Sequence, residues 1–384
     1  MRVALIHDFL TQFGGAERTL KVMHEIWPQA PIYTTFCDQK KLGKHFEGAK
    51  IYQSALAGWP LIGRFYKAFS FLYPLIFESL NLKDFDVIIS SSASFAKGVI
   101  TKPHQLHICY CYTPPRFLYH YPTETSYRNN PVFQVLLAPL DQFLRLWDFW
   151  AAQRVDEFVA ISETVKERIK KFYKRDSVVI YPPVSIGARC QVLGVSNGST
   201  PNPYPLAPSY FLVVSRLARY KNIDLAIKAC NNLGLSLKVI GVGREENNLK
   251  KMAGSTIEFL GEANDEQLAD YYQNCQAVIV PTSDEDFGLV PLEANSFGKP
   301  VIALRSGGMK EIVIEGKTGI FFENPTIESL LGVLRVWEKG RKWDKEFMKE
   351  WAGQFSKERF QRKLREFVEE KRQEKLKTFD RVAP

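Results

Sequence analysis

The sequence predicts an α/β protein made of two doubly wound, Rossmann-like domains that face each other across a cleft. Three observations support this fold class. The chain has 384 residues, too many for one ordinary hydrophobic core and suitable for two. Short apolar strands alternate with amphipathic helices in both halves, which is typical of parallel sheets covered by helices. A stretch rich in Gly, Pro, Ser and Asn separates the halves.

These observations give domain boundaries. We expect an N-terminal Rossmann-like domain at 1–184, a linker at 185–209 and a C-terminal Rossmann-like domain at 210–340. The remaining residues, 341–384, are expected to form helices that pack back on the N-terminal domain.

The composition excludes several classes of protein. With 45% hydrophobic and 24% charged residues, the chain is typical of soluble globular proteins. No run of 18 apolar residues predicts a membrane span, and the start lacks the pattern of a signal peptide. The six cysteines show no CxxC spacing, which favours reduced thiols in the cytoplasm. We expect Cys109 and Cys111 to point to opposite faces of a strand, which argues against a shared metal ion.

The net charge of +9 indicates an anionic partner. Nucleic acid, an anionic membrane surface and an anionic small ligand are the candidates, and no nucleic-acid-binding module is visible, so we expect no nucleic acid. The aromatic stretch 57–82 is either a pair of core helices broken at Pro74 or a helix that faces an acceptor or a membrane. We therefore expect a cytoplasmic chain, with peripheral association at the inner membrane face as an open option.

The first strand of the N-terminal half, RVALIHDF, leads into a glycine loop. Gly14 and Gly15 end this loop, and an amphipathic helix starts at Ala16. Glycine lets a backbone approach a phosphate closely, so this strand, turn and helix predict a phosphate-binding loop. A purely structural turn is the alternative.

Two further strands, in FDVIISSSASFAKGV and LHICYCYTPPRFLYHY, run into polar loops. The side chains at these strand ends are candidates for lining a cleft or binding an acceptor, and for each a structural role is the alternative: Ser94, Tyr112, Arg116 and His120. A long helix at 132–153 and a helix at 163–172, capped by Ser162, complete this half.

From Tyr210 the alternation restarts, with helices expected at 221–232, 244–252 and 265–273. Arg216 follows the first strand of this half, and Lys221 stands five residues on, at the expected start of a helix. Two cations at the mouth of a parallel sheet predict a clamp for a diphosphate. Ordinary surface cations are the alternative.

The stretch 282–298 carries the strongest signal of a site. It follows the buried strand AVIVP and places Glu285 in a loop at the carboxyl end of that strand, where open α/β sheets bind ligands. A helix is expected from about Gly288, with Glu293 one and a half turns into it. The backbone amides of Phe287, Gly288 and Leu289 then suit a phosphate.

A nucleoside diphosphate sugar fits these residues. Its two to three negative charges match Arg216, Lys221 and two helix ends worth about half a charge each, so no metal is needed. Glu293 would accept hydrogen bonds from ribose hydroxyls, and Glu285 would stabilise positive charge at the anomeric carbon. Three alternatives remain: a DxD metal site at Asp284 and Asp286, a hydrolase carboxylate pair, or two solvated glutamates on a helix cap.

Several motifs together resemble the retaining glycosyltransferases of family 4. They are ExFGxxxxE, here from Glu285 to Glu293, then SRLxxYKNxDLAI, TPPR, the amino-terminal GGAE, and GKPVIA with the GG and EIV that follow. The order matches over nearly the whole chain. The resemblance implies a GT-B fold, a nucleotide sugar bound mainly by the C-terminal domain, and transfer with retention of anomeric configuration, with no metal or other cofactor.

Carried over by position, the resemblance assigns donor-sugar contact to Glu285 and ribose contact to Glu293. It assigns the diphosphate to Arg216 and Lys221, and the amino-terminal glycine loop to Gly14 and Gly15.

The segment ICYCYTPPRFLYHY is similar to that of bacterial mannosyltransferase-like members that act on surface polysaccharides, in which a histidine occupies the place of Tyr112. This departure removes any contact that depends on a histidine. The resemblance implies a hexosyltransferase, with mannose as the candidate sugar, a GDP- or UDP-linked donor and a glycan or lipid-linked acceptor. A nucleotide-sugar epimerase or phosphorylase of the same architecture and a catalytically silent nucleotide- or glycan-binding scaffold are the alternatives.

Overall fold

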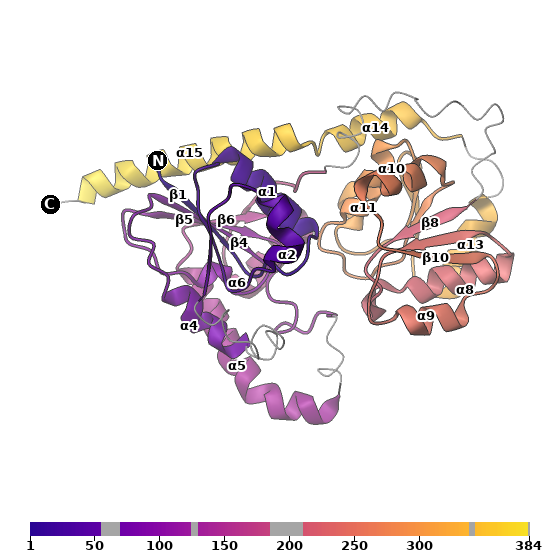
Figure 1. Cartoon of the computed structure of the whole chain (residues 1–384), viewed down its shortest axis with the longest axis horizontal. Helices are drawn as coiled ribbons and strands as arrows, with labels where there is room; N and C mark the ends of the chain where they lie inside the picture. Colours follow the sequence, from indigo (N-terminus) through magenta and orange to yellow (C-terminus); the bar gives the residue numbers. More distant parts are fainter. Residues whose placement is uncertain (55–69, 124–129, 185–209, 338–341, 383–384) are drawn as a thin grey trace. The chain divides into compact units, whose positions relative to one another are not determined.

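The computed structural model describes residues 1–54, 70–123, 130–184, 210–337 and 342–382 (Figure 1). The chain divides into two compact units, the first comprising Met1–Pro183 with Glu358–Pro384, and the second Val184–Lys357. The stretch 185–209 that we predicted as a linker lies outside the described residues, as does much of the aromatic stretch 57–82.

The first unit is built on a parallel sheet of seven strands in the order β3-β2-β1-β4-β5-β6-β7. The strands are β1 (Val3–His7), β2 (Ile32–Thr34), β3 (Ile51–Gln53), β4 (Val87–Ser92), β5 (Leu106–Cys111), β6 (Glu157–Ala160) and β7 (Val178–Val179). All residues of β1, β4 and β5 are buried, as expected for central strands that are covered on both faces.

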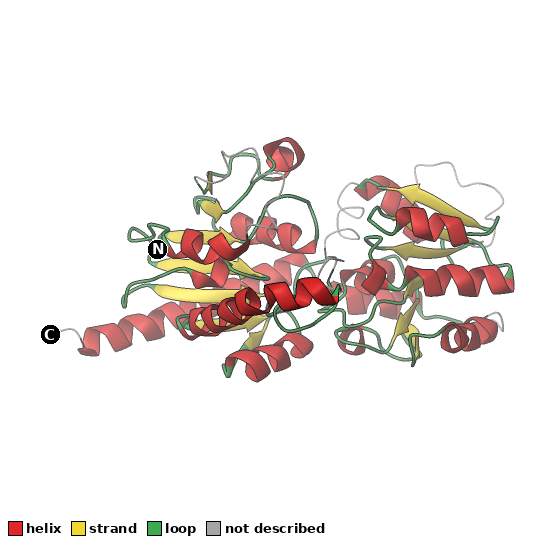
Figure 2. Cartoon of the chain, turned by 90° about the horizontal axis from the view of Figure 1, so that it is seen from below, coloured by secondary structure: helices red, strands yellow, loops and turns green. Residues whose placement is uncertain are grey.

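Helices lie on both sides of this sheet (Figure 2). They are α1 (Gly15–Ile26), α2 (Gln39–Leu42), α4 (Tyr73–Glu78), α5 (Pro131–Gln153), α6 (Glu163–Tyr173) and α15 (Lys357–Val382), with short 3-10 turns at η1 (Gly43–His45), η3 (Ser70–Leu72) and η4 (Ala96–Gly98). The predicted N-cap of α6 is confirmed, because Ser162 Oγ accepts the Val165 N–H at 3.0 Å.

The second unit has a parallel sheet of six strands in the order β10-β9-β8-β11-β12-β13. The strands are β8 (Phe211–Val214), β9 (Leu237–Ile240), β10 (Ile257–Gly261), β11 (Val278–Val280), β12 (Val301–Leu304) and β13 (Gly319–Phe322). The helices are α8 (Ile223–Leu233), α9 (Glu246–Met252), α10 (Asp265–Asn274), α11 (Leu289–Ser296), α12 (Met309–Ile312), α13 (Ile327–Trp337) and α14 (Lys345–Gly353). Two parallel sheets flanked by helices confirm the predicted fold class (Figure 2).

Helix α15 belongs to the first unit although it ends the chain. Phe360, Leu364 and Phe367 are buried on one side of it, and Phe360 meets Tyr110 of β5 edge to face at 5.7 Å. Phe355 lies in the turn before α15 and packs in the second unit, where its ring lies 5.9 Å from that of Phe287.

The expectation for Cys109 and Cys111 was wrong. Residues two apart on a strand point to the same face, so the two side chains are neighbours on one face of β5. Both are buried, and burial raises the pKa of Cys111 well above its usual value. Such a thiol is a poor nucleophile at neutral pH.

Candidate functional site

Four loops meet at the carboxyl edge of the second sheet, because β9, β8, β11 and β12 are neighbours in it. The loop after β8 carries Arg216 and Lys221. Lys221 closes a 3-10 turn, η6 (Arg219–Lys221), instead of opening a helix, and α8 begins two residues later at Ile223. The expected helix start was therefore wrong by two residues, because a short tight turn precedes the helix.

The closest contact among the predicted site residues joins Lys221 to Glu285. Lys221 Nζ donates to Glu285 Oε2 at 2.6 Å, and the two side chains are 12% and 23% exposed. Both are thus largely withdrawn from water while remaining reachable from solvent. The sequence placed these residues at one edge of a sheet, but not in contact.

Asn222 fixes the loop that carries Glu285. It has a positive φ of 52°, in the left-handed region that Asn tolerates better than most residues. Its side-chain amide donates to the Pro281 carbonyl at 3.1 Å and to Ser283 Oγ at 2.8 Å. Asn222 therefore ties the residue after Lys221 to the loop before Glu285. Sequence reasoning missed this role, although an Asn directly after the cation was a signal for it.

The loop after β12 holds the same segment from the other side. Ser306 Oγ accepts the Asp284 N–H at 2.9 Å, and Gly308 N–H donates to the Glu285 carbonyl at 2.8 Å. Gly307 has a φ of +53°, and a Cβ atom on it would lie 2.3 Å from the Glu285 carbonyl oxygen. Only glycine fits this approach. The sequence indicated a Gly-Gly turn here, but not its contact with Glu285.

Glu293 lies in the fifth position of α11 and is 9% exposed. The hydroxyl of Tyr272, a fully buried residue of α10, donates to Glu293 Oε2 at 2.9 Å. A carboxylate accepts several hydrogen bonds at once, so this bond orients Glu293 and is compatible with further bonds from a ligand. Sequence reasoning missed Tyr272, because its spacing is that of an ordinary core residue.

Tyr220 links the two predicted cations. Its hydroxyl accepts a long hydrogen bond of 3.5 Å from Arg216 Nη2, and its ring centroid lies 5.1 Å from Lys221 Nζ. A cation near an aromatic face is attracted to it. Arg216, Tyr220 and Lys221 therefore form one basic group on the loop after β8.

The predicted helix end lies directly after the Glu285 loop. Gly288 caps α11 with a φ of +96°, and a Cβ atom on it would lie 2.1 Å from Met309 Cε, so glycine is required there. The side chain of Phe287 is buried against Phe355, with ring centroids 5.9 Å apart. Leu289 is the first helical residue.

The strand ends of the first unit are arranged differently. Asp8, one residue past β1, is buried, and its carboxylate accepts four backbone N–H groups at 2.6 to 2.9 Å: those of Ala93, Ser94, Phe95 and Ala96. The backbone of the predicted cleft residue Ser94 is thus bonded to Asp8. Asp8 stabilises the loop after β4, a role that an Asp next to a buried strand could have suggested.

Tyr112 belongs to a buried polar group. Its hydroxyl donates to the Ala16 carbonyl at 2.9 Å and lies 2.9 Å from Ser91 Oγ, which in turn lies 3.0 Å from His7 Nδ1. Burial raises the pKa of Tyr112 above its ordinary value, so the phenol stays protonated at neutral pH. In this structure Tyr112 holds the first turn of α1.

The glycine loop is held by its own helix. Gly14 N–H donates to Glu17 Oε2 at 2.8 Å, and the Thr19 hydroxyl donates to the carbonyl of Gly15 at 2.8 Å. Glu17 is itself buried, with Oε1 3.9 Å from His7 Nε2. One amide predicted for a phosphate is therefore bonded to a carboxylate.

Arg116 and His120 make local contacts further along the same loop. Arg116 Nε donates to the Pro122 carbonyl at 3.0 Å. His120 is exposed, has a φ of 58°, and its Nε2 lies 3.4 Å from Arg145 Nη1.

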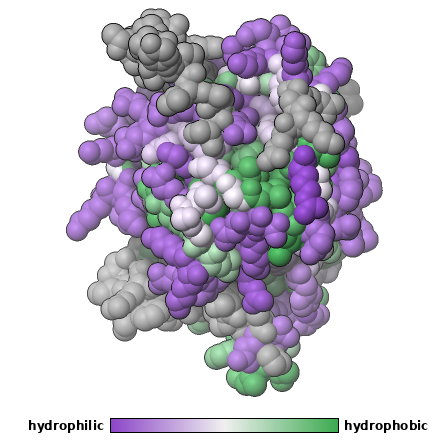
Figure 3. Space-filling model, turned by 90° about the vertical axis from the view of Figure 1, so that its right-hand side faces the viewer, coloured by the Kyte–Doolittle hydropathy of each residue, from purple (hydrophilic) through white to green (hydrophobic). Residues whose placement is uncertain are grey.

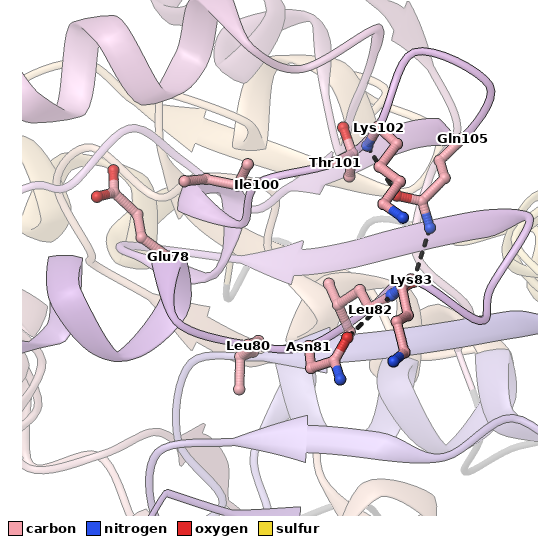
Figure 4. A pocket seen from close by; sticks show the side chains of 9 residues that line it. All are labelled: Glu78, Leu80, Asn81, Leu82, Lys83, Ile100, Thr101, Lys102 and Gln105. Carbon is pink, nitrogen blue, oxygen red and sulfur yellow. Dashed lines mark hydrogen bonds between the residues drawn. The ribbon is translucent and has the colours of Figure 1, made fainter.

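Two further features lie apart from these residues. Across the described ranges, no three His, Cys, Asp or Glu side chains converge in a way that could hold a metal ion. A pocket of about 210 Å³ in the first unit lies near the amino ends of β4 and β5 (Figure 4). It is lined by Glu78, Leu80, Asn81, Leu82, Lys83, Ile100, Thr101, Lys102 and Gln105, none of which the sequence predicted as a site residue.

Two family models match the chain. Residues 13–187 match "Glycosyltransferase Family 4", and residues 201–354 match "Glycosyl transferases group 1". The two matches together cover most of both units.

Curated relatives of the chain include two with long alignments. An uncharacterized glycosyltransferase of Methanocaldococcus jannaschii is 30% identical over 229 residues, which are 58% of this chain and 61% of that protein. The alignment thus spans less than two thirds of that relative. An alpha-1,3/1,6-mannosyltransferase of Candida glabrata is 25% identical over 82% of this chain and 78% of that protein.

Solved structures share the fold. Anabaena HepE in complex with UDP superimposes with a TM-score of 0.67 at 18% identity, covering 96% of this chain and 100% of that one. A sucrose-phosphate synthase from Thermosynechococcus elongatus gives a TM-score of 0.67 at 14% identity, covering 96% and 99%. The two sheets, the family matches and these superpositions agree: the chain is a glycosyltransferase of family 4 with the GT-B fold.

Proposed function

We propose that the chain moves a hexose from a nucleoside diphosphate sugar to a glycan or lipid-linked acceptor in surface polysaccharide assembly, with retention of anomeric configuration. The observation that carries the proposal is the contact of Lys221 with Glu285 at the carboxyl edge of the second sheet. A cation and a carboxylate held side by side suit a reaction in which a diphosphate leaves and positive charge develops at a sugar carbon.

The second unit is the donor side in this proposal. A diphosphate carries two to three negative charges, so it competes with the single carboxylate of Glu285 for Lys221, and Arg216 adds a second cation. When Lys221 pairs with the phosphate instead, Glu285 accepts hydrogen bonds from donor-sugar hydroxyls. Its negative charge then stabilises the oxocarbenium-like transition state. Glu293, oriented by Tyr272, would accept hydrogen bonds from the ribose.

The transfer step balances without a cofactor. The bond between the anomeric carbon and the β-phosphate oxygen breaks, and the nucleoside diphosphate leaves. The acceptor hydroxyl oxygen bonds to the anomeric carbon on the same face, and its proton passes to the departing phosphate oxygen. Arg216 and Lys221 neutralise the leaving group, so we propose that no metal is required.

We propose that the first unit binds the acceptor, with Ser94, Arg116 and His120 in the loops after β4 and β5 as candidate contacts and Tyr112 in a structural role. The mannosyltransferase activity printed for the Candida glabrata relative supports mannose as the candidate sugar. The UDP complex of Anabaena HepE supports a trial of UDP-linked donors beside GDP-linked ones.

The proposal is tested by incubating the purified chain with a panel of UDP- and GDP-hexoses, with and without a lipid-linked glycan acceptor. We expect one donor to release its nucleoside diphosphate in step with formation of an extended acceptor whose new linkage, by NMR, keeps the anomeric configuration of the donor. The exposed Glu258→Gln variant serves as a control with unchanged activity.

Other outcomes contradict the proposal in different ways. A changed donor sugar formed without an acceptor would identify an epimerase. An inverted linkage would contradict retention. Nucleotide binding with no turnover of any donor would favour a silent binding scaffold.

A further inference from the structure

Helix α5 presents an apolar face to solvent. Among the residues of α5 whose burial is described, eleven are exposed, and only two of these, Gln134 and Gln142, are polar. The large apolar members, here called the α5 face, are Val132, Phe133, Val135, Leu136, Phe143, Leu146 and Trp150, with exposed fractions of 46% to 73%. The lower end of Figure 3 shows apolar side chains gathered at the tip of this helix.

The opposite side of α5 is anchored in the first unit. Leu144 belongs to its core, and Asp148 forms a buried ion pair with Lys97. Trp147 Nε1 donates to Glu78 Oε1 at 2.8 Å. The helix is therefore held rigidly, and its α5 face is displayed outward.

A helix that is apolar on both sides is stable in water only if something covers it. All three charged residues of α5 lie outside the α5 face: Asp141, Arg145 and Asp148. Monomeric soluble proteins rarely expose so many large apolar side chains in one place, and such patches mark docking surfaces.

The surroundings indicate what the α5 face docks on. The segment 163–176, which forms α6 and its end, carries six basic and three acidic residues. Its basic end lies beside the end of α5, because Arg175 Nη1 donates to the carbonyls of Ala152 and Gln153 at 3.2 Å. Lys171 and Lys174 are exposed in this segment, and Trp150 of the α5 face lies two residues before Ala152, which Arg175 contacts. An apolar face with an aromatic residue next to lysines is the composition of helices that lie in an anionic membrane interface.

We propose that the α5 face, together with the basic end of α6, docks this chain on an anionic lipid surface. The inference rests on the proposed function, since a lipid-linked acceptor would be presented at such a surface. The described helices include none long and apolar enough to cross a bilayer, so the contact is one of lying on the surface. Membrane docking is one of the alternatives that the sequence leaves open for 57–82, and α5 provides a different, structurally defined surface.

The test is sedimentation of the full chain with vesicles of phosphatidylcholine alone and of phosphatidylcholine with phosphatidylglycerol. The variant L136Q/F143Q/L146Q removes three members of the α5 face. We expect it to bind the anionic vesicles about a hundredfold more weakly than the unchanged chain. The control V336Q/L376Q changes exposed apolar residues elsewhere and should bind as the unchanged chain does.

The basic end of α6 has its own variant. K171Q/K174Q should bind the phosphatidylglycerol vesicles about thirtyfold more weakly and the phosphatidylcholine vesicles equally well. All variants alter exposed side chains, so their melting temperatures should match that of the unchanged chain.

Two results would overturn the docking surface. One is equal sedimentation of the unchanged chain and L136Q/F143Q/L146Q. The other is that the unchanged chain binds no vesicles but self-associates in a concentration-dependent way, and that L136Q/F143Q/L146Q abolishes this self-association. A second copy of the chain would then be the occupant of the α5 face.

Titration of the same samples with UDP and GDP separates this inference from the proposed function. Loss of vesicle binding with intact nucleotide binding overturns only the docking surface, whereas vesicle binding without nucleotide binding overturns only the proposed donor site.

Discussion

The two units share a parallel sheet flanked by helices, but they use the polar residues at their strand ends differently. In the first unit, the Asp8 carboxylate is buried and accepts four backbone amides. In the second unit, Lys221 and Glu285 pair with each other and keep part of their surface in solvent. The first arrangement stabilises loops, and the second is open to exchange with a ligand. The difference shows that a polar strand end in this fold is not by itself a binding site.

The largest expected effect concerns stability. Asp8→Ala should lower the free energy of unfolding by about 3 to 5 kcal/mol, because several buried amides lose a charged acceptor. Urea unfolding measures this change, with Asp38→Ala, which removes an exposed helix cap, as a milder control. If Asp8→Ala lowers the free energy of unfolding no more than Asp38→Ala does, the structural role of Asp8 is contradicted.

The next effect concerns catalysis. Glu285→Gln should lower kcat by about a hundredfold to a thousandfold, because one charge that stabilises the transition state is lost. The melting temperature should change little, because Gln has nearly the shape of Glu and its amide oxygen still accepts a hydrogen bond from Lys221. Steady-state rates with the active donor measure the effect. Full activity of Glu285→Gln would place the chemistry elsewhere.

The third prediction concerns the pH dependence of stability and His107, another buried residue of the first unit. Burial lowers the pKa of His107 to about 4, below its ordinary value of 6.5. Its neutral form is favoured in the folded chain, so stability is full above pH 6.5 and falls as the pH drops toward 4, by up to about 1.4 kcal/mol per pH unit. Urea unfolding between pH 7 and pH 5 should show a smaller slope for His107→Gln. The exposed His104→Gln should keep the original slope, and equal slopes for both variants would refute the assignment.

The smallest effect tests the orientation of Glu293. Tyr272→Phe removes one hydroxyl, so the affinity for the nucleoside diphosphate should fall about fivefold to tenfold. The affinity for its 2′,3′-dideoxy analogue should hardly change, because that analogue lacks the ribose hydroxyls. Calorimetric titrations measure both, with the adjacent Tyr271→Phe as the matched control. An equal loss for both nucleotides would mean that Tyr272 acts on the fold and not on Glu293.

Much of the fold could be predicted from the sequence, because strands and helices follow local periodicity. The helix 132–153 and the Ser162 cap, for example, depend only on neighbouring residues. The pairing of Cys109 with Cys111 followed from the same periodicity, and our expectation for it failed because the strand period was misapplied.

The site was predictable only in part. Lys221 and Glu285 could be placed at one sheet edge, because the carboxyl ends of parallel strands meet there. Their contact depends on Asn222 and Gly307 in left-handed conformations, which no hydrophobic pattern encodes. The structural role of Tyr112 could not be inferred either, because a tyrosine at a strand end has the same sequence pattern whether it faces a ligand or stabilises a helix.

The most direct test of the account is calorimetric titration of the chain with UDP, GDP and ADP, each in excess EDTA and again with magnesium. We predict that a nucleotide binds equally well in both conditions, and that Arg216→Ala weakens this binding about tenfold or more while the Asp8 loop and the melting temperature are unaffected. Binding that requires magnesium would contradict the metal-free clamp and point to Asp284 and Asp286. No binding of any nucleotide would contradict a donor site at the carboxyl edge of the second sheet.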